Sequence, residues 1–336
     1  MKRKFCIAMY LITIIQFLLP LTLYANSCRK VFQSGGTNDN LTQKIGEEFR
    51  SYLQSKMDDT HMTKNLGEIS GEKMLLLMRG IFTPHEYPIT QDDFFRPRVR
   101  HTEYVDIHSL SSYLKTIVEK LKSDPTERKK LFSFIGKLEA HEDVDESETI
   151  VQEFANIMNI DLSQKEKHYF YIGPGVEFGK ALIREISRKK LDLHITFFDI
   201  SDYVIEVLSH IKTEKDLGKS TIEILQGDLT KYNFQSIKQK PDYLILAQVL
   251  HDTHLKGEEL KKVLQTFIDF LPPGGILHIN DLHHRFASTE TIKETYAFFS
   301  EKRTGINVTS NVYEELKSEY DRTIHPSVSV TAKKIN

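Results

Sequence analysis

Short apolar runs alternate with amphipathic segments through the second half of the chain, and this alternation constrains the fold most strongly. Five runs have the length of buried strands, at residues 168–172, 193–199, 220–225, 243–247 and 275–279. Segments with a helical spacing of apolar residues lie between and after them, at 179–189, 201–212, 257–270 and 289–304. A regular succession of strand and helix favours a parallel sheet covered by helices on both faces. We therefore predict an α/β domain over residues 158–336, with ligands binding at the carboxyl ends of the strands.

The first 40 residues have a different composition. Lys2, Arg3 and Lys4 precede an uncharged stretch that runs to Ser27, which is the pattern of a signal peptide. We predict residues 1–25 as a cleaved signal and export to the periplasm or the medium. An uncleaved membrane anchor is the alternative, because the stretch is long enough to span a bilayer. Residues 26–40 are polar and contain glycine, which indicates a linker.

Residues 41–157 have helical spacing without a motif that identifies a function. The helix-compatible segments lie at 41–56, 71–82, 109–123, 126–141 and 149–158. We predict a helical N-terminal region that acts as a partner or lid domain. The whole chain has 45 Lys and Arg against 47 Asp and Glu, a net charge of -2. Because no overall basic field exists to neutralise phosphates, we expect no nucleic-acid partner.

A glycine-containing turn follows the first apolar run and precedes a helical segment. The residues expected to bind a cofactor here are Gly173, Pro174, Gly175, Glu177 and Gly179. Glycines allow the backbone to turn tightly and to approach a ligand closely, and the helix N-terminus offers free amides. Such turns serve nicotinamide, flavin and S-adenosylmethionine proteins alike, so the turn by itself does not choose between them.

Acidic residues stand at the ends of the second and third runs. Asp199 suits two hydrogen bonds to the ribose hydroxyls of an adenosyl group, with an N-cap of the next helix as the alternative. Asp228 can accept a hydrogen bond from the exocyclic amine of adenine. The neighbouring residues Ile200, Leu229 and Gln248 complete the predicted cofactor-binding set.

The order of these landmarks resembles the core of class I S-adenosylmethionine-dependent methyltransferases. The turn Leu271-Pro272-Pro273-Gly274-Gly275 before the fifth run is among the more specific marks of that family, and the resemblance covers roughly residues 169–281. It implies a Rossmann-like domain with a mostly parallel seven-stranded sheet and S-adenosylmethionine as cofactor. Residues 327–334 alternate like a strand and resemble the last, antiparallel edge strand of this fold.

The sequence Val249-Leu250-His251-Asp252 is most similar to small-molecule O-methyltransferases of plants and bacteria, whose catalytic histidine lies in a corresponding His-Asp pair. The resemblance implies that His251 is the general base that takes a proton from the acceptor, with Asp252 or another nearby carboxylate orienting its ring. Two positions depart from the family pattern. Tyr171 stands where an acidic residue is usual, and Glu177 replaces a third glycine. We interpret Glu177 as a substitute acceptor for the ammonium group of the cofactor's methionine part.

Two other functions fit parts of the sequence. Tyr171 and the export signal favour a non-catalytic, exported module of the same fold that binds an adenosyl ligand or a small molecule. The glycine turn and Asp199 also fit an NAD-dependent dehydrogenase, although Asp228 and the Pro-Pro-Gly-Gly turn disfavour it. We expect a small-molecule acceptor, membrane contact only through the N-terminal segment, and no required metal despite the adjacent His283 and His284. A homodimer is one of the oligomeric states that we consider for this protein.

Overall fold

The protein is described by a computed structural model over residues 39–82, 107–141, 147–157, 160–247, 249–253, 255–282, 289–301, 305–317 and 324–335. The predicted signal peptide, the predicted linker up to residue 38 and the pair His283-His284 lie outside these residues. Within the described ranges, no helix has both the length and the apolar character needed to cross a bilayer. The chain divides into two compact units, residues 1–113 and 114–336.

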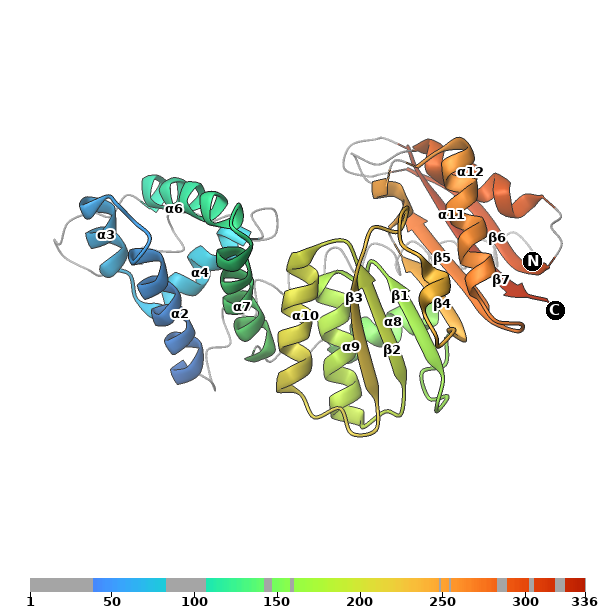
Figure 1. Cartoon of the computed structure of the whole chain (residues 1–336), viewed down its shortest axis with the longest axis horizontal. Helices are drawn as coiled ribbons and strands as arrows, with labels where there is room; N and C mark the ends of the chain where they lie inside the picture. Colours follow the sequence, from blue (N-terminus) through green and yellow to red (C-terminus); the bar gives the residue numbers. More distant parts are fainter. Residues whose placement is uncertain are drawn as a thin grey trace, which may run out of the picture. The chain divides into compact units, whose positions relative to one another are not determined.

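The first unit is helical, as the sequence predicts (Figure 1). It contains α2 (Asp39–Gln54), α3 (Thr60–Gly67), α4 (Gly71–Phe82) and the start of α6 (Ile107–Lys122), which continues into the second unit. Helices α2 and α4 approach closely because a side chain on Gly46 or Gly71 would collide with the backbone of the other helix. Phe49, Leu53 and Met74 are fully buried in this unit. The short α3, which the sequence does not predict, is capped by the Asp59 side chain.

The second unit is built on a seven-stranded sheet with the order β3-β2-β1-β4-β5-β7-β6. The strands are β1 (His168–Ile172), β2 (His194–Asp199), β3 (Thr221–Gln226), β4 (Tyr243–Ala247), β5 (Ile276–Leu282), β6 (Ile306–Lys317) and β7 (Ile324–Lys334). Strands β1 to β5 are parallel, and β7 is antiparallel to both β5 and β6. The mostly parallel seven-stranded sheet is therefore confirmed. The prediction that residues 327–334 form the edge is wrong, because β7 lies inside the sheet and β6 takes the edge.

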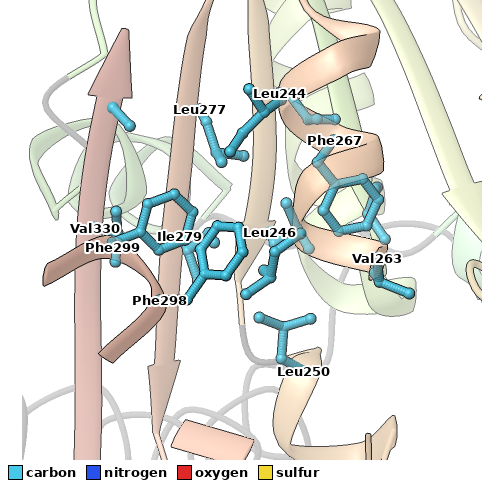
Figure 2. Packing of buried hydrophobic residues seen from close by; sticks show 14 of the residues in the cluster. Leu244, Leu246, Leu250, Val263, Phe267, Leu277, Ile279, Phe298, Phe299 and Val330 are labelled. Atoms are coloured by element: carbon cyan, nitrogen blue, oxygen red, sulfur yellow. The ribbon is translucent and has the colours of Figure 1, made fainter. Parts of the chain in front are cut away.

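Helices cover both faces of this sheet. They are α8 (Ser147–Ile157), α9 (Gly175–Lys189), α10 (Asp202–Glu214), α11 (Gly257–Phe270) and α12 (Thr289–Ser300), with short 3-10 helices η1 (Phe234–Ser236) and η2 (Leu250–Thr253). Helix α7 (Pro125–His141) belongs to the same unit and packs on α10. Figure 2 shows Leu246 of β4 and Ile279 of β5 facing side chains of α11 and α12, and these residues form the main buried cluster. On the opposite face, Tyr171 of β1 contacts α8 and α9 through Phe154 and Phe178.

Helix α7 joins this unit by packing along α10. The ring of Phe132 meets Tyr203 edge-on at 5.3 Å between centroids, and Gly136 lets His210 of α10 approach closely. Arg128 adds an ion pair to Asp202, with 2.7 Å between Nε and Oδ2. The compact unit therefore extends N-terminal of residue 158, where the sequence places the start of the α/β domain.

Candidate functional site

The predicted glycine turn connects β1 to α9 at the carboxyl end of the sheet. Gly173 and Gly175 have φ values of 65° and 62°, a conformation that other residues rarely adopt. A side chain on Gly173 would collide with Val249, whereas the corresponding position on Gly175 faces open space. Helix α9 begins directly after its N-cap Pro174, which makes no side-chain capping bond. The turn therefore leaves room and helix amides for a polar ligand.

Gly179 lies one turn further along α9 and has a different surrounding. It is buried, and a side chain at this position would press against Leu208 of α10. The absence of a Cβ thus allows α9 and α10 to pack closely. The structure gives this glycine a packing role and separates it from the open side of the turn.

Asp199 ends β2 and is partly buried. Its Oδ1 accepts a hydrogen bond from the Ser201 amide at 2.8 Å. Burial raises the pKa of the Asp199 carboxyl above its usual range, and the amides of Ser201, Gly175 and Ile200 oppose that rise. The N-cap of α10 is Ser201, whose hydroxyl accepts from the Val204 amide, so Asp199 is not the N-cap residue of this helix. Ile200 beside it is 67% exposed and offers an apolar surface.

Asp228 follows β3 in a tight polar turn. Its Oδ1 accepts from the amide and the hydroxyl of Thr230 at 2.9 and 2.6 Å, and Lys231 lies 3.0 Å from Oδ2. The Thr230 bonds and Lys231 lower the pKa of Asp228 to about 2, so the carboxylate is ionised at neutral pH. Leu229 packs against the main buried cluster.

Two groups of side chains lie next to the turn in sequence: the aromatic rings around Tyr171, and the ion pair of Glu177 with Lys180. Tyr171 stacks on Phe178 at 4.8 Å between ring centroids and contacts Phe154 at 5.4 Å. Burial raises the pKa of the Tyr171 hydroxyl, so it stays neutral. Glu177, with 37% of its side chain exposed, forms an ion pair of 3.0 Å with the buried Lys180.

The loop after β4 is fixed by a buried carboxylate that sequence reasoning did not assign to the site. Asp281 at the end of β5 is 0% exposed, and its Oδ2 accepts from the amides of Val249 and Leu250 at 3.1 and 2.6 Å. These amides lead directly into η2, which carries the backbone of His251 and Asp252; their side chains and Gln248 lie outside what the structure describes. An acidic residue at the carboxyl end of the fifth run was the available signal for Asp281.

The predicted landmarks lie side by side at the carboxyl ends of β1 to β4. The Gly173 amide donates to the Phe198 carbonyl at 2.8 Å, and the Gly227 amide donates to the Asp199 carbonyl at 2.9 Å. Val249 packs onto Gly173, which places the loop of His251 beside the turn. The carboxyl ends of the strands therefore bring together the glycine turn, the loops of Asp199 and Asp228, and the loop after β4.

This strand order, with an antiparallel β7 between β5 and β6 and a glycine turn after β1, defines the Rossmann-like methyltransferase class. The model of the O-methyltransferase domain family matches residues 139–320, which is more than half of the chain. The chain therefore belongs to the O-methyltransferase domain family. This membership confirms the resemblance and the predicted methyltransferase, and it shows that the dehydrogenase alternative is wrong.

Solved structures of methyltransferases are similar to this chain at low identity. A S-adenosylmethionine-dependent methyltransferase from Methanosarcina mazei shares 15% identity over 52% of this chain and 95% of its own, with a TM-score of 0.39. The N-methyltransferase NodS from Bradyrhizobium japonicum shares 14% identity over 57% and 97%, with a TM-score of 0.39. Coclaurine N-methyltransferase shares 10% identity over 87% and 100%, with a TM-score of 0.41. No curated protein sequence matches significantly. The family assignment depends on the match over residues 139–320.

Proposed function

We propose that this protein transfers a methyl group from S-adenosylmethionine to a hydroxyl group of a small molecule. The observation that carries the proposal is that the open turn at Gly175, the partly buried Asp199 and the loop after β4 adjoin one another at the carboxyl ends of the strands. Membership of an O-methyltransferase family supports oxygen as the accepting atom. S-adenosylmethionine is the methyl donor, and its sulfonium supplies an electrophilic methyl group.

The residues at this edge fit the parts of such a donor. Gly175 leaves space beside the backbone, and the amides at the start of α9, where Pro174 makes no capping bond, suit the carboxylate of the methionine part. Asp199 offers carboxylate oxygens to the ribose hydroxyls, and the exposed Ile200 suits the flat adenine ring. Asp228 is ionised at neutral pH and can accept from the adenine amine. Glu177 is the acceptor we assign to the ammonium group.

His251 is the general base in this proposal. The chain must place the acceptor oxygen behind the methyl group and remove the hydroxyl proton, which an imidazole can do near neutral pH. Asp281 supports this role from the β5 side because it holds the amides of Val249 and Leu250 next to His251. General-base catalysis contributes about 10²- to 10⁴-fold in rate, so loss of His251 leaves binding intact and slows turnover.

Two measurements test the proposal. Calorimetry is expected to show binding of S-adenosylmethionine, weakened in Asp199→Ala, and no binding of NADH. A panel of phenols and aliphatic alcohols with radiolabelled methyl donor then identifies an acceptor, for which His251→Ala should reduce kcat by about 10²-fold or more and leave donor affinity unchanged. Donor binding without transfer to any acceptor would favour the non-catalytic module. Equal losses of turnover and donor affinity in His251→Ala would contradict its role as base.

Export of the protein is a separate proposal based on the basic and apolar pattern of residues 1–25. Expression of the full chain followed by fractionation and N-terminal sequencing tests it. A mature chain that begins at Asn26 outside the cytosol is expected. An intact N-terminus in the membrane fraction would indicate the anchor instead.

A further inference from the structure

The segment that follows His251 is held by a helix distant in sequence. The hydroxyl of Thr291 on α12 donates to the carbonyl oxygen of Leu255 at 2.6 Å. One turn later, Oε2 of Glu294 accepts from the Gly257 amide at 2.5 Å. These two bonds join α12 to the end of the stretch between η2 and α11, and Leu255 lies only four residues after His251.

The position of these bonds makes them strong restraints. Thr291 is 0% exposed and Leu255 is 7% exposed, so water competes little for the Thr291 hydroxyl bond. Helix α12 is itself anchored in the main buried cluster by Ile292, Phe298 and Phe299. Figure 2 shows Phe298 and Phe299 facing Leu246 of β4 and Ile279 of β5. The segment that follows His251 is therefore held by a helix, α12, that is itself fixed by packing in the core.

Glu294 also replaces a helix cap that the local sequence lacks. The N-cap of α11 is Lys256, which makes no side-chain capping bond, and the next residue, Gly257, has a φ of 57°. A carboxylate beside a helix N-terminus satisfies an otherwise unpaired amide and interacts favourably with the helix dipole. Glu294 thus fixes where α11 begins and where the loop before it ends.

The loop is consequently restrained from both sides. Asp281 holds the amides of Val249 and Leu250, and α12 holds the Leu255 carbonyl and the Gly257 amide. We infer that Thr291 and Glu294 are positioning residues for methyl transfer, which act by holding the loop that carries His251. This inference rests on the proposed function, since it assumes that His251 takes the acceptor proton.

Helix α12 provides a matched pair of variants for the test. Thr291 and Thr295 are one turn apart, both are 0% exposed, and replacement by valine removes one hydroxyl in each case. The Thr295 hydroxyl donates to the Thr291 carbonyl at 2.8 Å, so its hydrogen bond stays within the helix. We expect Thr291→Val to lower kcat by about 10- to 100-fold with the acceptor found for the wild type, because small misplacements of a catalytic group are costly. Thr295→Val should keep kcat within about twofold of the wild type.

Three further readouts separate positioning from general destabilisation. The affinity for S-adenosylmethionine should be unchanged in Thr291→Val, and Thr291→Ser should restore kcat because it keeps the hydroxyl. Glu294→Gln should retain more activity than Glu294→Ala, because its amide oxygen can still accept from Gly257. Hydrogen exchange of the peptide over residues 249–256 needs no acceptor, and it should be faster in Thr291→Val than in Thr295→Val.

The outcomes distinguish this inference from the proposed function. Equal kcat values or equal exchange of residues 249–256 in Thr291→Val and Thr295→Val would overturn the inference, whatever the result for His251. Full activity in His251→Ala would overturn the proposed base. A loss of kcat in both Thr291→Val and His251→Ala, with donor affinity intact and rescue by Thr291→Ser, is the expected result.

Discussion

Gly173 and Gly175 share a left-handed backbone but differ in their surroundings. Alanine at Gly173 must adopt an unfavourable φ and also collide with Val249, whereas alanine at Gly175 meets open space. We predict that Gly173→Ala lowers the free energy of unfolding by about 1–3 kcal/mol more than Gly175→Ala, because overpacking adds to the backbone strain. Urea unfolding of the two variants measures this difference.

The same pair tests whether the open space is used by a ligand. Gly175→Ala should weaken binding of S-adenosylmethionine although its fold is the better preserved of the two, because the added methyl group occupies the space beside the turn. Unchanged donor affinity in Gly175→Ala would show that the donor does not enter this space.

Glu177 is the residue on which recognition of the donor's amino group depends in our proposal. Its carboxylate is held by Lys180 at 3.0 Å and remains partly exposed beside the turn. We predict that Glu177→Gln weakens S-adenosylmethionine binding about 10- to 150-fold, the value of one charge-assisted hydrogen bond. Methylthioadenosine, which lacks the amino-acid part, should bind wild type and variant equally. A parallel loss for both ligands would instead indicate a damaged turn.

Among the elements, α7 and α9 are joined by a buried charge. Lys180 lies 2.5 Å from Glu139 of α7, and the exposed fractions of the two side chains are 5% and 12%. Burial alone would lower the pKa of Lys180, but Glu139 and Glu177 outweigh it and hold the pKa above its usual value. The ammonium group therefore depends on both partners.

We predict that Glu139→Gln lowers the free energy of unfolding by about 2–3 kcal/mol, because it leaves a buried ammonium with one carboxylate. Glu258→Gln is the control. Its ion pair with Lys261 is exposed, and such pairs contribute no more than about 1 kcal/mol. Comparable losses in the two variants, measured by urea unfolding, would mean that the ion pairs of Lys180 with Glu139 and Glu177 stabilise the fold no more than an exposed ion pair does.

The sequence predicted the elements whose pattern is local. β1, β4 and α11 begin and end at the predicted residues, because apolar runs and the flanking turns define them. Strand β6 was not predicted as a strand. A bulge between Val308 and Ser310 shifts its register and interrupts the two-residue alternation that reveals a strand. Its position at the edge also leaves Val312 exposed, so the burial signal is weak.

At the scale of the whole molecule, some residues of the site were predicted from the sequence and others were not. The glycine turn and the carboxylates Asp199 and Asp228 follow strands directly, so their order in the chain indicates their meeting at one edge. Asp281, Thr291 and Glu294 bind backbone atoms 31 to 37 residues away, which no local pattern records. Long-range backbone contacts of this kind require the fold to be known.

Stability of the whole unit should depend on a histidine inside the sheet. His278 of β5 is 3% exposed, and burial lowers its pKa to about 4. The imidazole is neutral in both states above about pH 6.5, and below that the unfolded chain binds a proton that the native state excludes. The native state therefore loses stability as the pH falls from 6.5 through 4. Burial lowers the pKa of His168 as well, which acts in the same direction.

We predict that His278→Phe, which keeps an aromatic ring beside Tyr243, makes the stability less dependent on pH. Between about pH 7 and pH 4.5 the wild type should lose on the order of 2 kcal/mol more than the variant in urea unfolding. His61→Gln, at an exposed position of α3, should retain the wild-type dependence. A wild-type slope in His278→Phe would mean that the buried ring takes up its proton without unfolding, and that the sheet admits water at this position.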